Sequence, residues 1–150
     1  MLIKETGAIV IDYPDMMVGR FCLKAGDVIP HHLHKGQYAL TYLLSGKSRV
    51  NCYAHEKLSE TDYCLTLASS DVVIANQAMT LTPELNVHSI AAIEDSVFLD
   101  VFSPGKQDGE GVTVFFDIVE NRGETLLAKV MPKEQVSLPE DITQFDRYSV

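Results

Sequence analysis

Short segments with the composition of β-strands fill most of this chain, and they constrain its fold more than any other feature. Ten such segments are rich in β-branched and aromatic residues, and Gly, Pro, Asn, Asp or Ser separates each from the next. Helical periodicity is absent except for a weak stripe at residues 134–145, which Pro139 interrupts. Short strands at near-regular spacing predict an all-β sandwich or barrel. The segments lie at residues 7–13, 20–26, 38–46, 48–54, 63–69, 71–77, 86–92, 96–103, 112–119 and 125–131.

Length and composition narrow the class of protein. A chain of 150 residues without repeats or linkers predicts a single domain over residues 1–150. The net charge of −9 and the absence of any Lys/Arg run argue against nucleic acid or a membrane as a partner. Three cysteines without CxxC spacing, no signal peptide and no long apolar stretch predict a cytoplasmic protein.

Three of the five histidines stand within four positions, at 31, 32 and 34. Along a β-strand, residues i and i+2 share a face while i+1 points the other way. His32 and His34 are therefore expected to converge, and His31 is expected to face away. A metal site would need a third ligand from elsewhere, and His88 is the strongest candidate, because His55 falls in a polar turn. The alternative for the His-x-His pair alone is an ordinary surface or hydrogen-bonded pair.

The glycines and prolines around these histidines carry a resemblance to a known superfamily. Gly26, five residues, His32-Leu33-His34 and then Gly46 reproduce the pattern G(X)5HxH…G, which is the first motif of the cupins. Pro83 and His88 keep the spacing of the second motif, PxGxxH, with Leu85 at the usual second glycine. The resemblance implies a cupin jelly-roll β-barrel, also called a double-stranded β-helix, with a metal bound inside its mouth by His32, His34 and His88.

The carboxylate of the usual cupin metal shell is missing. The resemblance places a glutamate at position 38 or 39, where this chain has Tyr38 and Ala39, and Gln37 stands one place early. Three neutral imidazoles leave the charge of a bound divalent ion uncompensated, which favours an anionic exogenous ligand such as a thiolate. The alternative is a cupin that has lost a ligand and binds metal weakly or not at all.

Two longer runs are similar to the plant cysteine oxidase and cysteamine dioxygenase family, which oxidises thiols. They are FCLKAGDVIPHHLHKGQYALTYLLSGKSRVNCYA at 21–54 and LNVHSIAAIEDSVFLDVFSPGKQDGEGVTVFFD at 85–117. The resemblance implies Fe(II) on the three histidines and a role near the site for Asp100. It weakens in one loop: the family's PPY is Pro104-Gly105-Lys106 here, and its GRxC begins with Gly111-Val112 and lacks the cysteine. The assignment of the metal therefore carries over more safely than that of the substrate.

Three side chains remain as candidates for contact with a substrate. Asp100 shares a predicted strand face with two phenylalanines, so it should be paired, protonated or functional; a salt bridge to a basic residue is the structural alternative. Arg20 precedes the histidine segment and could hold a substrate carboxylate, although a solvated strand arginine is more common. Tyr38 could donate a hydrogen bond to substrate, although cross-strand aromatic packing is the more common role.

The hypothesis that best joins these features is a non-haem iron(II) thiol dioxygenase. It would oxidise a thiol to a sulfinic acid with O2, the thiol being a small molecule or the amino-terminal cysteine of a peptide. A metal-dependent cupin of another activity, such as an isomerase or another oxygenase, and a ligand-binding or sensor cupin without turnover are the alternatives. Nickel or zinc is expected in the purified protein beside iron. The sequence leaves open whether the protein is a monomer or a homodimer.

Overall fold

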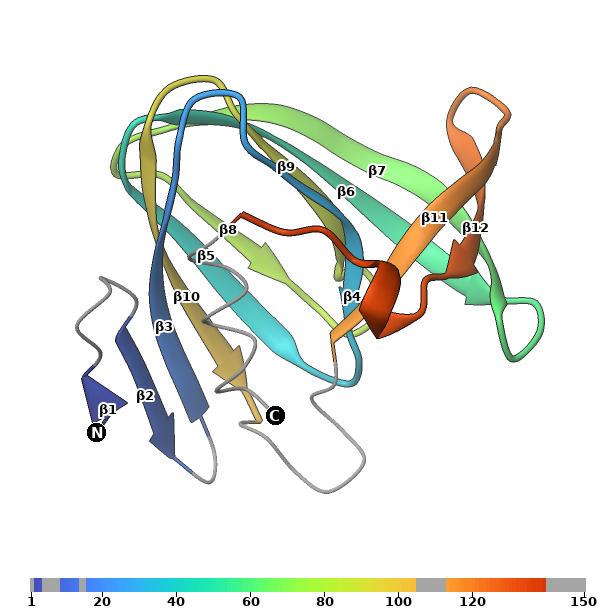
Figure 1. Cartoon of the computed structure of the whole chain (residues 1–150), viewed down its shortest axis with the longest axis horizontal. Coiled ribbons are helices and arrows are strands. Elements are labelled where there is room, and N and C mark those ends of the chain that lie inside the picture. Colours follow the sequence, from blue (N-terminus) through green and yellow to red (C-terminus); the bar gives the residue numbers. More distant parts are fainter. Residues whose placement is uncertain (1, 4–8, 14–15, 105–112, 140–150) are drawn as a thin grey trace.

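A computed structural model describes residues 2–3, 9–13, 16–104 and 113–139 of the chain. Within these residues the fold is all-β apart from one short 3-10 helix, as the sequence predicts (Figure 1). The elements are β1 (Leu2–Ile3), β2 (Ile9–Tyr13), β3 (Met16–Leu23), β4 (Val28–His34), β5 (Tyr38–Ser45), β6 (Lys47–Lys57), β7 (Asp62–Ile74), β8 (Ala78–Leu81), β9 (Val87–Ala92), β10 (Ser96–Ser103), β11 (Thr113–Asn121), β12 (Thr125–Val130) and the helix η1 (Lys133–Gln135).

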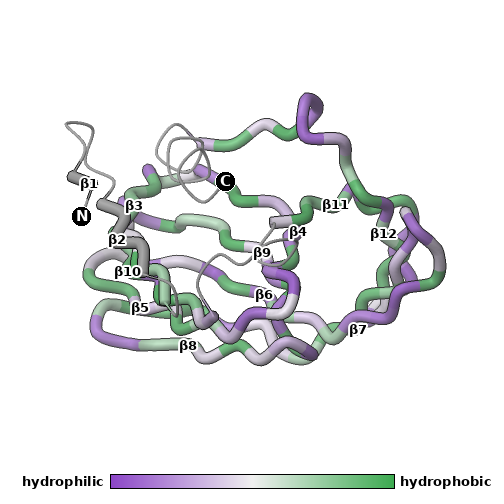
Figure 2. Tube along the Cα trace, turned by 90° about the horizontal axis from the view of Figure 1, so that it is seen from below, coloured by the Kyte–Doolittle hydropathy of each residue, from purple (hydrophilic) through white to green (hydrophobic). Residues whose placement is uncertain are grey.

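The strands form two antiparallel sheets. One has six strands in the order β1-β2-β3-β10-β5-β8, and the other closes into a six-stranded barrel in the order β11-β12-β7-β6-β9-β4. In both views the β1–β2 pair and the β11–β12 hairpin lie at opposite ends of the molecule (Figures 1 and 2). Strands distant in sequence pair with one another, as β10 does with β3 and with β5, so the sheets depend on long-range contacts.

Two predicted strands are one strand in the structure, and β1, β4 and β8 lie outside the ten predicted segments. Residues 63–69 and 71–77 were expected to be separated at Ser70, but β7 runs through it, because residues 69–71 pair with residues 50–52 of β6. Cross-strand pairing here overrides the local turn preference of Ser and Asp. Of the strands outside those segments, β8 is only four residues long and pairs with β5 at the edge of its sheet. No described helix has the length and hydropathy needed to cross a membrane.

Alternation along the strands divides the buried side chains into two clusters. The first, which we call the inter-sheet core, has members from both sheets, including Phe21, Phe98 and Ile90. The second comes only from strands of the closed barrel and includes Leu33, Leu65 and Phe116. Because consecutive residues of a strand point to opposite sides, β4 sends Leu33 into the second cluster and its neighbours at 32 and 34 toward the first.

The glycines of the first cupin motif stand at turns that require them. Gly26 has a φ of +92° and Gly46 a φ of +94°, both in the left-handed region that glycine tolerates. At Gly46 a Cβ would also collide with the carbonyl oxygen of Asp95. These two turns bracket β4 and β5, so they fix where the histidine-bearing strand begins and where the next strand of the chain, which belongs to the other sheet, ends.

Candidate metal centre

Three histidines from two neighbouring strands converge in the inter-sheet space. His32 and His34 lie at the end of β4, and His88 lies at the start of β9, where it is the direct antiparallel partner of His32. One ring nitrogen from each of the three lies within 4.8 Å of the others. All three side chains are buried, with 5%, 8% and 2% of the surfaces of His32, His34 and His88 exposed. The structure therefore brings together the three residues that the sequence singled out.

Backbone carbonyls set the protonation of two of the rings. Nδ1 of His32 donates to the carbonyl oxygen of Pro30 at 2.8 Å, and Nδ1 of His88 donates to that of Asn86 at 3.2 Å. Since a carbonyl oxygen can only accept, the proton of each neutral ring is on Nδ1 and the lone pair is on Nε2. Such a hydrogen bond orients a histidine and leaves Nε2 available as a metal ligand.

Burial keeps the three rings neutral. It holds the pKa of His32 and the pKa of His34 well below the ordinary value, with the charge of neighbouring histidines adding to the effect. Burial also lowers the pKa of His88 to about 4, although its hydrogen bond to Asn86 opposes the shift. A neutral imidazole is the form that binds a metal, so the cluster is ready to bind one at neutral pH.

The donor set fits a divalent transition metal. Nε2 of His34 is buried and has no hydrogen-bond partner among the described residues, while its Nδ1 lies 3.5 Å from the hydroxyl of Thr113. A buried nitrogen lone pair without a donor is costly unless a ligand occupies it. Imidazole ligands suit iron, zinc, copper and nickel. Three nitrogens on one side of a cavity leave further coordination positions open toward that cavity.

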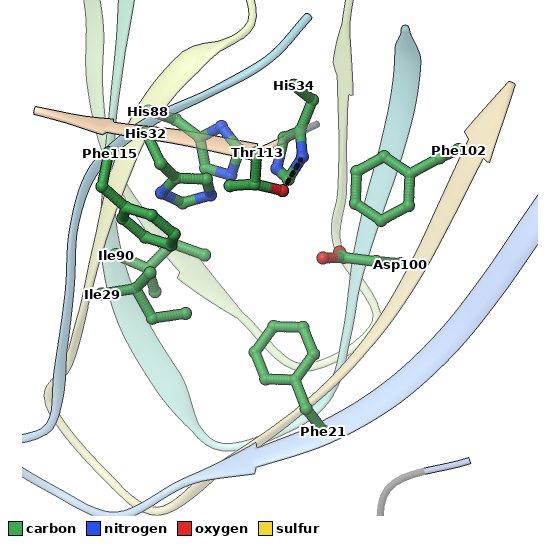
Figure 3. Close-up of a pocket in the computed structure, with 10 residues that line it drawn as sticks. All are labelled: Phe21, Ile29, His32, His34, His88, Ile90, Asp100, Phe102, Thr113 and Phe115. Atoms are coloured by element: carbon green, nitrogen blue, oxygen red, sulfur yellow. Dashed lines mark hydrogen bonds between the residues drawn. The ribbon is translucent and has the colours of Figure 1, made fainter. Parts of the chain in front are cut away.

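The cavity beside the histidines has mostly apolar walls. Figure 3 shows the three imidazoles on one side, with Asp100 pointing into the space from β10. Aromatic rings and isoleucines form most of the remaining wall, which contains no lysine or arginine among the residues that the structure describes. An apolar wall strengthens any charge interaction inside the cavity. The full lining is Phe21, Ile29, His32, His34, His88, Ile90, Asp100, Phe102, Thr113 and Phe115.

Asp100 is the one acid among the described residues that faces this cavity. It lies on the inward face of β10 with Phe98 and Phe102, as predicted, and it is 5% exposed. Its cross-strand partners are Thr41 and Gly19. Burial raises the pKa of Asp100 to about 7, and a hydrogen bond with the side chain of Thr41 opposes the shift. Its Oδ1 has no partner among the described residues, so the predicted structural salt bridge is not found there.

The other predicted residues lie away from the cavity. His31 points to the opposite side of β4 and packs on Tyr53, with ring centroids 5.1 Å apart. Arg20 and Tyr38 do not line the cavity, because Phe21 and Ala39, their neighbours in the chain, take the inward positions. Tyr38 is 56% exposed. Thus strand alternation separates both proposed substrate contacts from the histidines.

Part of the loop that departs from the family pattern lies outside the described residues. This applies to Gly105, Lys106, Gly111 and Val112. Pro104 is described, and its carbonyl oxygen accepts a hydrogen bond from the side chain of Gln37 at 2.9 Å.

Several residues around the site were not identified from the sequence. Thr41 could have been found, because it takes an inward position between Ala39 and Leu43 on β5. Asn86 and Gln37 are polar but almost fully buried, and both precede strands. Nothing in a single sequence distinguishes such residues from ordinary turn residues. Thr113 reaches His34 only through the pairing of β11 with β4, which sequence reasoning did not predict.

Solved structures of similar fold place the chain in a structural class. It resembles KdgF from Halomonas sp., with a TM-score of 0.54 and 21% identity over 71% of this chain and 87% of that one. It also resembles a double-stranded β-helix protein from Klebsiella pneumoniae, with a TM-score of 0.52 and 17% identity over 76% of this chain and 88% of that one. An RmlC-like cupin from Shewanella frigidimarina has a TM-score of 0.52 and 16% identity over 70% of this chain and 84% of that one. At these identities the likeness shows the fold alone: the protein is a cupin.

The family match is more specific. The sequence matches the PCO_ADO family, the plant cysteine oxidases and cysteamine dioxygenases, over residues 6–148. The chain therefore belongs to this family, whose members are thiol dioxygenases that use a thiol and O2. A buried three-histidine set is typical of Fe(II) in these enzymes, and this chain has that set. The protein is a thiol dioxygenase of the cupin fold.

Proposed function

We propose that His32, His34 and His88 hold the catalytic iron(II) and that the thiol oxidised carries an amine. The reaction adds both atoms of O2 to the sulfur of the thiol and yields a sulfinic acid. The observation that carries the proposal is the pairing of a buried, neutral three-histidine cluster with a single buried acid across an apolar cavity.

The histidines favour a thiolate beside the metal. They contribute no negative charge, because an imidazole ligand is uncharged, and burial prevents the three rings from becoming protonated. Bound iron(II) supplies the redox chemistry that joins O2 to sulfur. The chain's own contribution is to hold the imidazoles of His32 and His88 in place through the carbonyls of Pro30 and Asn86 and to keep the remaining walls apolar.

Asp100 is the proposed partner of the substrate's ammonium group. It is the only acid on the cavity wall within the described part of the chain, and its Oδ1 accepts no hydrogen bond there. An ammonium beside it would favour the ionised carboxylate, in opposition to the burial that raises its pKa to about 7. Among the described residues, no arginine or lysine lines the cavity to attract a carboxylate instead. Cysteamine or a peptide with an amino-terminal cysteine fits this pattern better than a mercaptocarboxylate.

The proposal also covers the number of domains, the cellular location, the partners and the oligomeric state of the enzyme. We infer one domain over residues 1–150 and a cytoplasmic location, which three cysteines outside any disulfide support. The acidic charge of −9 disfavours nucleic acid and anionic membranes as partners. We expect a monomer or a homodimer, and light scattering of the purified protein decides between them.

The test is oxygen consumption by protein that has been reconstituted anaerobically with iron(II). Cysteamine, a peptide with an amino-terminal cysteine, free cysteine and 3-mercaptopropionate are compared, and mass spectrometry identifies the sulfinic acid. We expect the first two to be oxidised with the highest kcat/KM, at about one O2 per thiol. Asp100→Asn should raise KM for these amine thiols at least tenfold and change that for 3-mercaptopropionate less than threefold.

Two results would contradict the proposal, one for the amine-bearing substrate alone and the other for all of the proposed thiol substrates. A clear preference for 3-mercaptopropionate would refute the role of Asp100 and the amine substrate while keeping the dioxygenase. Oxygen consumption that no thiol stimulates would refute the proposed substrates altogether. Asp71→Asn, which changes an exposed acid on β7, is the matched control and should leave all four substrates unaffected.

A further inference from the structure

Asn86 lies where the two histidine-bearing strands stop pairing. The ladder between β4 and β9 pairs His32 with His88 and Leu33 with Val87, and that is its last pair. The next position would place His34 opposite Asn86. At this position a side-chain hydrogen bond replaces the backbone pairing: Nδ2 of Asn86 donates to the carbonyl oxygen of His34 at 2.6 Å. A side-chain amide thus continues the connection between the strands beyond the end of the ladder.

The same amide holds the turn that follows His34. Nδ2 of Asn86 also donates to the carbonyl oxygen of Gln37 at 2.9 Å, so both of its hydrogens are used. The reverse orientation of the amide would place Oδ1 against two carbonyl oxygens, which is unfavourable. The amide is fully buried, with 0% of the residue exposed, so water cannot replace either bond without a rearrangement.

The backbone of Asn86 acts on a different histidine. Its carbonyl oxygen accepts the hydrogen bond from Nδ1 of His88 that leaves Nε2 of that ring free. One residue therefore contacts two of the three proposed ligands, His34 through its side chain and His88 through its main chain. No ladder pair joins these two positions directly, so Asn86 adds a direct link between them to the register that β4 and β9 already set.

Gln37 extends the connection to the opposite wall of the cavity. While its carbonyl accepts from Asn86, its own Nε2 donates to the carbonyl oxygen of Pro104, just beyond the end of β10. Asp100 and Phe102 lie on that strand and line the cavity. A continuous run of hydrogen bonds thus joins the segment of His88 to the turn after His34 and to the strand of Asp100.

We propose that Asn86 is a positioning residue that sets the geometry of the three-histidine centre by tying His34 to His88. The proposal rests on the ligand assignment of the proposed function but needs no particular substrate. Loss of an outer hydrogen bond of this kind typically weakens a metal site 10- to 100-fold. We therefore expect removal of the amide to change both the affinity and the symmetry of a bound metal.

The test uses cobalt(II) added anaerobically to the metal-free protein. Titration calorimetry gives its Kd, and the visible d–d spectrum reports its coordination geometry. In Asn86→Leu, which keeps much of the volume but has no donor, and in Asn86→Ala, we expect Kd to rise at least tenfold with an altered spectrum. Leu65→Ala is the matched control, because it creates a cavity in the closed-barrel cluster, away from the histidines. It should lower the melting temperature and leave Kd within threefold.

The outcomes separate this proposal from its competitors. If the Asn86 variants bind cobalt(II) as the wild type does, with the same spectrum, the positioning role is overturned and the ligand assignment stands. If Leu65→Ala weakens binding as much as they do, Asn86 acts only through stability, which also overturns the role. If oxygen consumption fails with every thiol while the cobalt(II) results hold, the substrate proposal falls and the positioning role survives.

A measurement on the unaltered chain covers the case in which neither variant folds. The side-chain amide protons of Asn86 should exchange with water at least 100-fold more slowly than those of Asn121, whose side chain is exposed. Zinc(II), a diamagnetic probe, should slow the exchange at Asn86 further, because the metal holds His34 and His88 in place. Exchange as fast as that of Asn121 would show that the amide is not held by the two carbonyls, and would refute the proposal.

Discussion

His32 and His88 are direct antiparallel partners on β4 and β9, and their ring centroids lie 4.1 Å apart. Opposite residues on paired strands send their side chains to the same face, so this register alone places two imidazoles together. His34 joins them because it is two residues along the same strand, with its ring 5.2 Å from that of His88. The metal centre thus follows from the register between β4 and β9 and from the alternation of side chains along β4.

The first prediction compares two histidines that are adjacent in the chain. His32→Ala should abolish iron binding and turnover, because it removes a ring from the cluster of three. His31→Ala should keep stoichiometric iron and at least half of the activity, because His31 packs on Tyr53 on the other side of β4. Iron content by mass spectrometry and oxygen consumption are the measurements. Loss of iron from His31→Ala would mean that the register of β4 is wrong.

Much of this centre could be predicted before the structure was known. The His-x-His spacing on a strand predicted which two of three neighbouring histidines converge, and the alternation of Phe98, Asp100 and Phe102 predicted that the acid faces inward. These features need only the period of a strand. The position of His88 needed more, because its distance from His32 depends on a register that one sequence does not specify.

The features that the sequence did not predict concern residues whose positions depend on pairing with distant strands. Arg20 and Tyr38 were considered without a fixed alternation, and the structure assigns the inward positions to Phe21 and Ala39. The Ser-Ser-Asp run at 69–71 looked like a turn because its pairing with β6 is not visible locally. Asn86 shows no local sign of its contacts with His34 and Gln37, which are 52 and 49 residues away in sequence.

The second prediction concerns the metal. Affinity for imidazole sites rises toward nickel and copper, so the purified protein should contain nickel or zinc beside iron. Removal of these metals with a chelator and reconstitution with iron(II) should restore thiol-dependent oxygen uptake, whereas zinc(II) should restore less than 1% of it, because zinc has no redox chemistry. Equal activity with zinc would contradict the dioxygenase mechanism. Metal content and oxygen uptake are measured on the same samples.

The third prediction concerns protons released when metal binds at pH 7. The three histidines are already neutral there, because burial lowers their pKa values, so they should release almost none. Asp100, with its pKa raised to about 7, is about half protonated, and a cation across the cavity should ionise it. Calorimetry with cobalt(II) in buffers of different ionisation enthalpy should give roughly half a proton per metal. In Asp100→Asn the release should disappear; an unchanged value would exclude Asp100 as its source.

The fourth prediction is the pH dependence of stability in the metal-free protein. The pKa values of the three histidines are lower in the folded state, so their contribution to stability is present above about pH 6.5 and is lost as the pH falls, in the case of His88 through about 4. The pKa of Asp100 is raised instead, so its contribution is present below about pH 4 and is lost as the pH rises through 7. Between pH 4 and pH 6.5, the effect of Asp100 on the slope of stability against pH has the opposite sign to that of a histidine, so Asp100 cancels the effect of one of the three histidines.

Asp100→Asn removes the contribution of Asp100 to the pH dependence of stability. Above pH 7 the variant should be more stable than the wild type, by on the order of 4 kcal/mol, because a buried charge is replaced by a neutral amide. Below pH 6.5 its stability should fall more steeply with acid, since three histidines then titrate without a compensating group. Urea unfolding of the metal-free proteins between pH 4.5 and 8 gives both slopes, with the exposed acid of Asp71→Asn as the control. If Asp100→Asn and the wild type have parallel curves, Asp100 is ionised in the folded protein throughout this range, and the burial that raises its pKa is offset by a contact that the cavity does not show.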